Sequence, residues 1–194
     1  DEFKFSDLEN IYMATVIGLR DYVSKNNFPG VILGLSGGID SAFCAAVAVD
    51  ALGKDKVEAY MLPSAYTSEN STIDAEDCAN RLEINLETIS ISDTFLSLEE
   101  SLKTSFEGLP NDITEENLQS RIRGTILMAI SNKKGKMLIT TGNKSEVSVG
   151  YSTLYGDMNG GFNPIKDIYK TELYALANWR NNNLPNNILL DKKD

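Results

Sequence analysis

Histidine is absent from this chain, and its absence removes several classes of active site. Neither a Ser-His or Cys-His nucleophile pair nor a histidine-ligated zinc site can be formed. Any general acid–base catalysis would have to use Asp, Glu, Lys, Tyr or water. The chemistry therefore has to be sought among carboxylates, amines, hydroxyls and backbone groups.

Cysteine is scarce as well, because Cys44 and Cys78 are the only two in the sequence. Both stand in apolar patterns of helical spacing, which predicts small buried residues in a reducing compartment, the cytoplasm. Nothing near either cysteine in the sequence would lower the pKa of its thiol, so we expect no reactive cysteine pair.

Basic residues are in the minority, with 18 Lys and Arg against 28 Asp and Glu and a net charge of −10. A nucleic-acid surface requires clustered Lys and Arg, so we expect no nucleic-acid partner. No apolar run approaches the ~20 residues of a membrane span, so we expect no membrane partner either. With 42% hydrophobic residues over 194 positions, the composition is that of a globular domain with a proper core.

The most informative stretch runs from Val31 to Ser41 and reads Val-Ile-Leu-Gly-Leu-Ser-Gly-Gly-Ile-Asp-Ser. The apolar run 31–35 predicts a buried strand, the glycines after it predict a tight turn, and the apolar run 42–52 predicts a helix. A strand, a glycine turn and a helix start aim backbone N–H groups and the positive end of a helix dipole at one spot. This geometry predicts an anion site suited to phosphate.

The stretch matches neither of the two common phosphate-binding loops. A Walker loop requires a Gly-Lys pair, and a dinucleotide-binding turn requires Gly-x-Gly-x-x-Gly; neither occurs here. The hydroxyls of Ser36 and Ser41 could hold a pyrophosphate, and Asp40 among phosphates makes sense as a Mg²⁺ ligand. The pattern Ser-Gly-Gly-x-Asp-Ser resembles the signature of the ATP pyrophosphatases, which split ATP into AMP and pyrophosphate.

Strand and helix patterns alternate along the rest of the chain. Strands are expected at 31–35, 57–62, 86–91 and 137–141, and helices at 8–26, 41–52, 69–82, 92–106, 117–131 and 165–180. This alternation predicts an α/β fold with a doubly wound parallel sheet and helices on both faces. Ligands bind such sheets at the carboxyl ends of the strands, so we expect 36–41, 63–68, 140–146 and the glycine-rich loop 150–164 to meet there.

Four segments of the sequence, the glycine turn among them, occur in a characteristic order. They read Leu35-Ser-Gly-Gly-Ile-Asp-Ser-Ala, Asn117-Leu-Gln-Ser-Arg-Ile-Arg, Thr141-Gly-Asn-Lys-Ser-Glu, and Gly150-Tyr-Ser-Thr-Leu-Tyr-Gly-Asp with Asn163-Pro and Lys170 behind it. In this order the segments resemble the NAD synthetase family, above all the synthetase domain of its glutamine-dependent branch. The resemblance runs from about residue 8 to residue 190, nearly the whole chain.

This resemblance implies the adenine nucleotide alpha-hydrolase-like fold of the ATP pyrophosphatases and the activity of a carbon–nitrogen ligase. ATP would adenylate the nicotinate carboxylate of deamido-NAD with release of pyrophosphate. Ammonia, taken up free or derived from glutamine in the intact protein, would then displace AMP and form NAD. No side-chain nucleophile is needed, so the lack of histidine is no obstacle.

The resemblance also assigns roles to individual residues. It implies ATP contacts at Ser36, Gly37, Gly38, Asp40, Ser41, Thr141 and Lys170. It implies Mg²⁺ ligands at Asp40 and Glu146, and deamido-NAD contacts at Asn117, Arg121 and Glu146. The residues closest to the chemistry would be Asp40, Lys170 and Asp157, the last in a loop that closes over the reacting centre.

Taken one at a time, these residues have simpler explanations. Asp40 and Glu146 could be helix-start carboxylates, and Asp157 could be a turn former. Arg121 and Arg123 stand two positions apart on a predicted helix and diverge by about 200°, so both cannot face one ligand squarely. The joint order of the motifs, rather than any single residue, favours the ligand-binding interpretation.

We expect residues 1–194 to form one NAD synthetase domain that lacks a glutamine amidase domain before it and a segment after it. Family members form dimers, so a homodimer or higher oligomer is expected, with the helix at 8–26 and the helix at 117–131 as candidate contacts. One alternative is another ATP pyrophosphatase, such as a GMP synthetase-like or tRNA-modifying enzyme, although tRNA would suit the acidic charge poorly. A non-catalytic nucleotide-binding module is the alternative from a different class.

Overall fold

The computed structural model describes residues 7–183, and a parallel sheet lies at their centre. Within these residues the strands are β1 (Val31–Gly34), β2 (Val57–Met61), β3 (Asn85–Thr88) and β4 (Met137–Ile139), and their order is β3-β2-β1-β4. The chain adds β2 and β3 on one side of β1 and then returns to place β4 on the other side. The strand order therefore reverses between β1 and β4, which is where ligands bind in doubly wound sheets.

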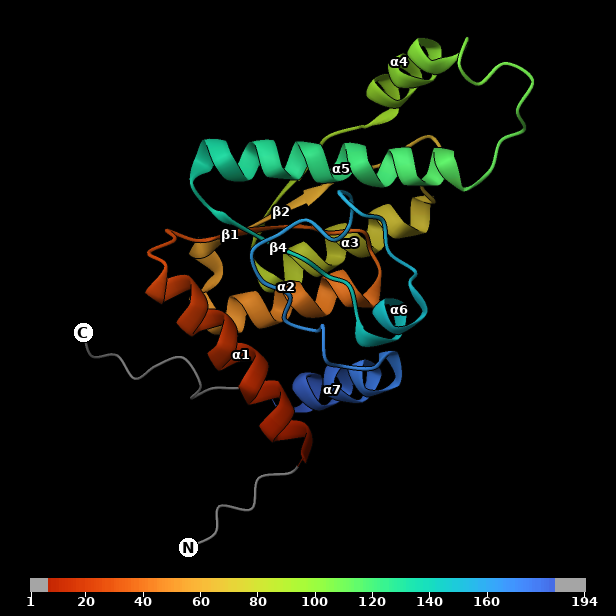
Figure 1. Cartoon of the computed structure of the whole chain (residues 1–194). Coiled ribbons are helices and arrows are strands. Elements are labelled where there is room, and N and C mark those ends of the chain that lie inside the picture. The colour runs from red at the N-terminus through yellow and green to blue at the C-terminus, as the bar shows by residue number, and fades with distance from the viewer. Residues whose placement is uncertain (1–6, 184–194) are drawn as a thin grey trace, which may run out of the picture.

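Two helices cover one face of the sheet, and two more are stacked behind them (Figure 1). α2 (Ile39–Leu52) and α3 (Glu69–Leu82) pack on the strands, while α1 (Asp7–Lys25) and α7 (Lys170–Asn182) pack against α2. α2 is apolar nearly all round, because it is covered both by the sheet and by these outer helices. The main apolar core lies in this layer.

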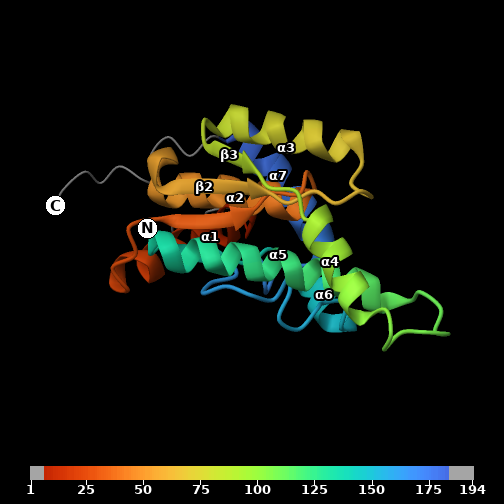
Figure 2. The ribbon, with the colours of Figure 1, turned by 90° about the horizontal axis from the view of Figure 1, so that it is seen from above.

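The opposite face is covered by α5 (Ile113–Lys134), which lies against β1 and β4 (Figure 2). α4 (Ser92–Leu102) packs on α5, and the short elements η1 (Lys54–Lys56) and α6 (Lys144–Val149) complete the described part. The predicted α/β fold, with a doubly wound parallel sheet and helices on both faces, is confirmed. No helix among residues 7–183 has the length and apolar character needed to cross a membrane.

An ionic cluster is buried between α1, α2 and α7. Asp50 of α2 is 6% exposed and accepts hydrogen bonds from the Tyr12 hydroxyl and from Arg180 Nη2, the latter at 3.0 Å. Burial, reinforced by the neighbouring Asp50 carboxylate, raises the pKa of the Tyr12 phenol. The cluster joins the three helices behind the sheet, and its residues do not line the cavity described below.

The predicted strand 86–91 is assigned only to residues 85–88, but its edge pairing continues further. The N–H groups of Ile89 and Ile91 donate to the carbonyls of Met61 and Pro63, each at 2.9 Å. The pattern therefore predicted the extent of the interaction with β2 better than the length of the regular strand.

The predicted helix 165–180 was wrong at its start, because α7 begins at Lys170. Ile165 and Ile168 are buried, but the chain turns through this stretch, and Asn163 Oδ1 accepts the Ile165 N–H at 3.1 Å. Buried apolar spacing thus imitated an extra helical turn. The later start places Lys170 in the first turn of α7, which matters for the site.

Two other helix limits differ from the prediction by four residues each. The helix expected at 117–131 begins at Ile113, because Asp112 and Glu115 form a capping box in front of it. The helix expected at 92–106 ends at Leu102 and is followed by turns. The ends of the predicted domain, residues 1–6 and 184–194, lie outside the described residues.

Candidate active site

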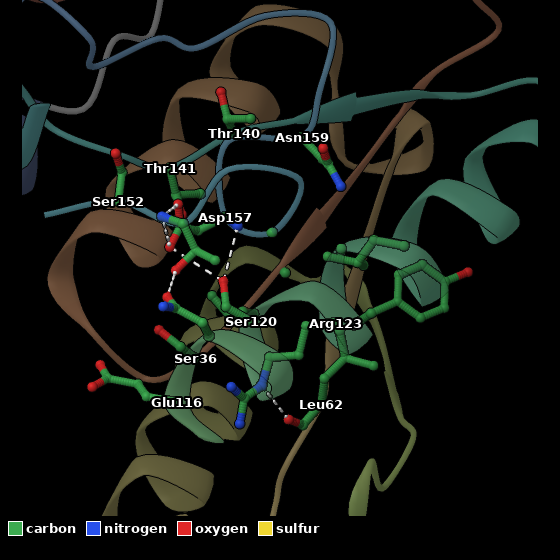
Figure 3. Close-up of a pocket in the computed structure, with 18 of the residues that line it drawn as sticks. Ser36, Leu62, Glu116, Ser120, Arg123, Thr140, Thr141, Ser152, Asp157 and Asn159 are labelled. Carbon is green, nitrogen blue, oxygen red and sulfur yellow. Dashed lines mark hydrogen bonds between the residues drawn. The ribbon is translucent and has the colours of Figure 1, made fainter. Parts of the chain in front are cut away.

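A cavity of about 820 Å³ opens at the carboxyl ends of β1, β2 and β4, where the strand order reverses (Figure 3). Its walls come from these strand ends, from α5 and from residues 150–159 of the long loop. Four of the predicted site residues line it: Ser36, Asn117, Thr141 and Asp157. The expected meeting of the segments at this edge of the sheet is therefore confirmed. Cavities of this volume hold small-molecule ligands and cofactors.

The turn after β1 has the backbone geometry predicted for an anion-binding loop. Gly37 has a φ of +82°, and a Cβ at this position would lie 2.2 Å from the Ser71 carbonyl oxygen. Only glycine can therefore occupy position 37 without displacing α3. Ser41 Oγ accepts the Ser36 N–H at 3.1 Å and donates to the Gly38 carbonyl at 3.0 Å, so it holds the turn closed.

The N-terminus of α2 differs from those of its capped neighbours. Gly38 is its N-cap and offers no side chain to cap the first turn, and within residues 7–183 the nearby Ser36 side chain accepts, of the backbone N–H groups at this end, only that of Gly38, at 3.3 Å. By contrast, α3, α5 and α6 are capped by the side chains of Ser68, Asp112 and Asn143. The first N–H groups of α2 and its dipole therefore face the turn without a side-chain acceptor, as an anion site requires.

Asp40, in the first turn of α2, forms an ion pair with Lys170 at the start of α7. The Asp40 side chain is 18% exposed and the Lys170 side chain 36%, so a ligand can reach both. α6 fixes the start of α7, because Ser145 Oγ accepts the Lys170 N–H at 3.0 Å. The fold thus brings two predicted site residues, one anionic and one cationic, into direct contact.

Glu146, the second predicted Mg²⁺ ligand, is linked to Asp40 through Asn143. Asn143 Nδ2 donates to Asp40 Oδ1 at 2.9 Å, and Asn143 Oδ1 accepts the Glu146 N–H at 3.1 Å. In return, Glu146 Oε2 accepts the Asn143 N–H at 3.2 Å. Glu146 therefore belongs to the capping box of α6 and also shares a neighbour with Asp40.

The two carboxylates fit a magnesium ion better than they fit a metal held by protein alone. Mg²⁺ is usually bound through one or two carboxylates, with substrate phosphates and water as its other ligands. Asp40 and Glu146 are both partly exposed and both contact Asn143. Within the described part of the chain, no three or more His, Cys, Asp or Glu side chains gather as metal ligands. A bound nucleotide would therefore have to complete the coordination.

Asp157 holds the long loop against α5 (Figure 3). Its carboxylate accepts the Thr153 N–H at 2.9 Å and the Ser120 hydroxyl at 3.3 Å. Thr153 Oγ1 in turn donates to Asn117 Oδ1 at 2.9 Å. Gly156 allows this close approach, since a Cβ there would lie 2.3 Å from Ser120 Oγ. Asp157 and Asn117 therefore help to hold the loop on α5, and both also line the cavity.

The two arginines of α5 point to different places, as their spacing predicted. Arg121 is exposed, does not line the cavity, and donates from Nε to the Leu154 carbonyl at 3.2 Å. Arg123 lines the cavity and donates from Nε to the Leu62 carbonyl at 2.9 Å (Figure 3). Burial lowers the pKa of the Arg123 guanidinium. The cavity therefore adds Arg123 to the candidates, although the sequence had favoured Arg121.

Three of the site's contacts were missed by sequence reasoning. Asn143 stands immediately before α6, so its position predicts a helix cap but not its contact with Asp40. Ser120 carries no motif, and its role became visible only when the loop was placed on α5. Tyr151, which donates to Glu116 Oε1 at 2.9 Å at the cavity wall, likewise has no local signal.

The structure supports the prediction that neither cysteine is reactive. Cys44 is buried, Cys78 is partly buried, and both are free. Burial raises the pKa of both thiols, so neither is activated as a nucleophile.

Known proteins resemble this chain over most of its length. The family model described as NAD synthase matches residues 11–193. The chain is 56% identical over 175 residues to the glutamine-dependent NAD(+) synthetase of Rhodobacter capsulatus and 54% identical over 173 residues to that of Thermotoga maritima. These matches cover 90% and 89% of this chain but 32% and 30% of the two relatives. The chain therefore spans about a third of the length of these curated relatives.

Solved structures agree with the sequence comparison. The glutamine-dependent NAD⁺ synthetase of Acinetobacter baumannii, solved with ADP, superposes with a TM-score of 0.92 at 49% identity, over 94% of this chain and 35% of that one. The NH₃-dependent NAD synthetase of Campylobacter jejuni superposes with a TM-score of 0.83 at 32% identity, over 91% of this chain and 75% of that one. The fold is thus the ATP pyrophosphatase type found in NAD synthetases. By family model, sequence identity and structure alike, the chain belongs to the NAD synthase family.

Proposed function

We propose that this chain carries the synthetase activity that converts deamido-NAD to NAD, with ATP as the activating substrate. The observation that carries the proposal is the arrangement of Asp40 and Lys170 at the uncapped start of α2, beside the cavity at the reversal of strand order. Membership of the NAD synthase family supports the same activity.

ATP is proposed to place its phosphates on the 36–41 turn. The free N–H groups of α2 and the Ser36 and Ser41 hydroxyls would bind phosphate oxygens, with Gly37 and Gly38 permitting close approach. Thr141, at the carboxyl end of β4, would contact the nucleotide from the other side of the strand reversal. Lys170 would exchange its contact with Asp40 for a contact with phosphate.

Deamido-NAD is proposed to occupy the part of the cavity between α5 and the long loop. Asn117 lines this part, and Arg121 and Glu146 are assigned to the same substrate from the family resemblance. Arg123 could contribute as well, because its guanidinium lies in the cavity wall and forms no ion pair within residues 7–183. Asp157 would position the loop over the reacting carboxylate through its bonds to Ser120.

The proposed reaction has two steps that balance without a protein nucleophile. A nicotinate carboxylate oxygen attacks the α-phosphorus of ATP, a new O–P bond forms, and pyrophosphate leaves. Ammonia then attacks the acyl carbon, AMP leaves with that oxygen, and the amide nitrogen loses a proton. Lys170 would stabilise the charge that develops on the departing pyrophosphate. Magnesium bound by Asp40 and Glu146 would supply charge neutralisation on the phosphates.

Several broader features belong to the same proposal. We propose that ammonia comes from glutamine hydrolysed elsewhere in the intact protein, as the names of the two curated relatives described above suggest. A homodimer through α1 and α5 is proposed, supported by the exposed Ile17 and Tyr22 on α1 and by Ile113 on α5. A cytoplasmic location is proposed on the basis of the two unactivated, free thiols.

The alternatives are less well supported. The family match does not favour a GMP synthetase-like or other ATP pyrophosphatase activity. A non-catalytic nucleotide-binding module would leave the contact between Asp40 and Lys170 without a catalytic purpose.

The test is an assay of pyrophosphate, AMP and NAD with the intact protein, Mg-ATP, deamido-NAD and ammonium, in which each component is omitted in turn. The proposal predicts equal amounts of the three products, and no pyrophosphate without deamido-NAD. ATP binding without product would support a binding module instead. Pyrophosphate formation with GMP precursors in place of deamido-NAD would support a different ATP pyrophosphatase.

A further inference from the structure

Asn143 is fully buried, and both the oxygen and the nitrogen of its side-chain amide form hydrogen bonds. Its relative exposure is 0%, the lowest among the buried polar residues. The amide oxygen accepts the Glu146 N–H at 3.1 Å, and the amide nitrogen donates to Asp40 Oδ1 at 2.9 Å. A cap for α6 needs only the oxygen. The hydrogen bond from the Asn143 amide nitrogen to Asp40 is therefore not needed for capping α6.

The donor end fixes the orientation of the Asp40 carboxylate. An aspartate carboxylate rotates broadly about its terminal torsion unless a hydrogen bond holds it. Asn143 holds Oδ1, and this leaves Oδ2 as the oxygen that faces Lys170. A ligand that displaces Lys170 would thus meet one carboxylate oxygen already aimed at it.

The same residue also sets the position of Glu146 relative to Asp40. The Asn143 N–H donates to Glu146 Oε2 at 3.2 Å, while its amide holds Asp40. Asp40 lies on α2 and Glu146 on α6, and the two helices are far apart in the sequence. Asn143 is therefore a bridge whose one conformation fixes both carboxylates.

We propose that Asn143 is a positioning residue that orients Asp40 and Glu146 for binding the metal–nucleotide substrate. This inference rests on the proposed function, and deepens it by naming a residue that acts through the two carboxylates without touching the substrate. Residues that orient metal ligands typically change metal affinity by about 10- to 100-fold when they are replaced.

The decisive variant is Asn143→Ser, because serine caps helices about as well as asparagine but is too short to reach Asp40. Asp112→Ser is the matched control, since it makes a similar change at the cap of α5, where the cap has no contact with Asp40. Both variants are measured in the intact protein by electron paramagnetic resonance of Mn²⁺ in the presence of ATP. The Mg²⁺ dependence of pyrophosphate release and the melting temperature are measured alongside.

The proposal expects Asn143→Ser to weaken Mn²⁺ binding with ATP by about 10- to 100-fold and to raise the half-saturating Mg²⁺ concentration similarly. Asp112→Ser should leave both unchanged, because the cap of α5 has no contact with Asp40. Equal Mn²⁺ affinity in wild type and Asn143→Ser, or an equal loss in both variants, would overturn the proposal. A wild type that binds Mn²⁺ and ATP but makes no NAD would contradict the proposed function alone, because the binding comparison would still decide the role of Asn143.

A second measurement needs no variant and covers the case in which Asn143→Ser does not fold. A crystal structure of the intact protein with Mg²⁺ and a non-hydrolysable ATP analogue should retain the bond from Asn143 Nδ2 to Asp40 Oδ1 while Lys170 moves to phosphate. Loss of the Asn143–Asp40 bond on binding would contradict a positioning role.

Discussion

Lys170 and Asp40 form an ion pair although they lie 130 positions apart in the sequence. Each is proposed to bind a different part of Mg-ATP, and in the structure each neutralises the other. An ion pair with side chains 18% and 36% exposed is worth at most about 1 kcal/mol. The pair therefore keeps both side chains ordered near the turn, and substrate binding can open it at small cost.

Replacing Asp40 separates catalysis from folding. Asp40→Ala should lower the rate of pyrophosphate release roughly 100-fold or more, because a charge that organises the phosphates is lost. The free energy of unfolding should fall by about 1–3 kcal/mol, because the buried Asn143 amide loses its acceptor while the partly exposed pair with Lys170 contributes little. Steady-state kinetics and urea unfolding measure the two effects.

Asp77→Ala is the matched control for this variant. Asp77 forms an exposed ion pair with Arg81 on α3, at 2.7 Å. Its loss should change neither activity nor stability appreciably. An Asp40→Ala enzyme as fast as the Asp77→Ala enzyme would contradict a role for Asp40 in the reaction.

Gly156 tests whether the position of the long loop matters for the substrate. In Gly156→Ala the new Cβ would lie 2.3 Å from Ser120 Oγ, so the loop has to move away from α5. We expect the KM for deamido-NAD to rise, and a displacement of about 1 Å can cost up to about 100-fold in rate. Gly18→Ala is the control, because its Cβ would meet only Phe162 at 3.5 Å, an ordinary contact. Unaltered kinetics in Gly156→Ala would show that loop placement is irrelevant.

The buried cluster behind the sheet governs stability rather than activity. Arg180→Met would leave Asp50, which is 6% exposed, as a buried charge without its cation. The free energy of unfolding should fall by about 3–5 kcal/mol. Chemical denaturation measures this loss, while the rate per folded molecule at low temperature should stay close to wild type.

A double replacement distinguishes charge burial from simple loss of contacts in this cluster. Asp50→Leu combined with Arg180→Leu removes both charges, and should recover part of the stability lost in Arg180→Met, less the cost of the buried Tyr12 hydroxyl that loses its acceptor. A double variant at least as unstable as Arg180→Met would contradict the electrostatic explanation.

The lowered pKa of Glu58 predicts a loss of stability at low pH. Burial tends to raise the pKa of Glu58, but hydrogen bonds from Lys134, Lys136 and Tyr60 outweigh it and lower the pKa to about 2. The usual value is 4.5, so the folded chain holds the Glu58 proton more weakly than the unfolded chain. Ionised Glu58 therefore contributes stability above about pH 4.5, and this contribution is lost as the pH falls towards 2.

The effect of Glu58 is checked by measuring the free energy of unfolding in urea for wild type and Glu58→Gln between about pH 2 and 6. The wild type should lose stability more steeply than the variant as the solution is acidified. Parallel stability curves for the two proteins would show that the network around Glu58 has no such effect.

The sequence predicted those features that depend on local pattern. The alternation of strands and helices and the tight turn at Gly37 both follow from spacing and from backbone requirements within a few residues. Because carboxyl ends of parallel strands share one edge, the meeting of Ser36 and Thr141 at one cavity also followed.

The features that were not predicted depend on how side chains point from one helix or strand toward another that is distant in the sequence. Asn143 could be recognised as a cap, but its donor bond to Asp40 depends on how α6 sits beside α2. Arg123 enters the cavity wall because of the rotation of α5 about its axis, which a helix with little amphipathic contrast does not reveal. The start of α7 was misplaced because Ile165 and Ile168 are buried outside any helix.

The most direct test of the proposed chemistry follows the oxygen atom that is transferred in the adenylation step. Deamido-NAD labelled with ¹⁸O at both oxygens of its nicotinate carboxylate is converted with Mg-ATP and ammonium, and the AMP and pyrophosphate are analysed by mass spectrometry. Attack of the carboxylate on the α-phosphorus predicts one ¹⁸O in each AMP and none in pyrophosphate. Unlabelled AMP, or label in pyrophosphate or inorganic phosphate, would contradict adenylation of deamido-NAD by this protein.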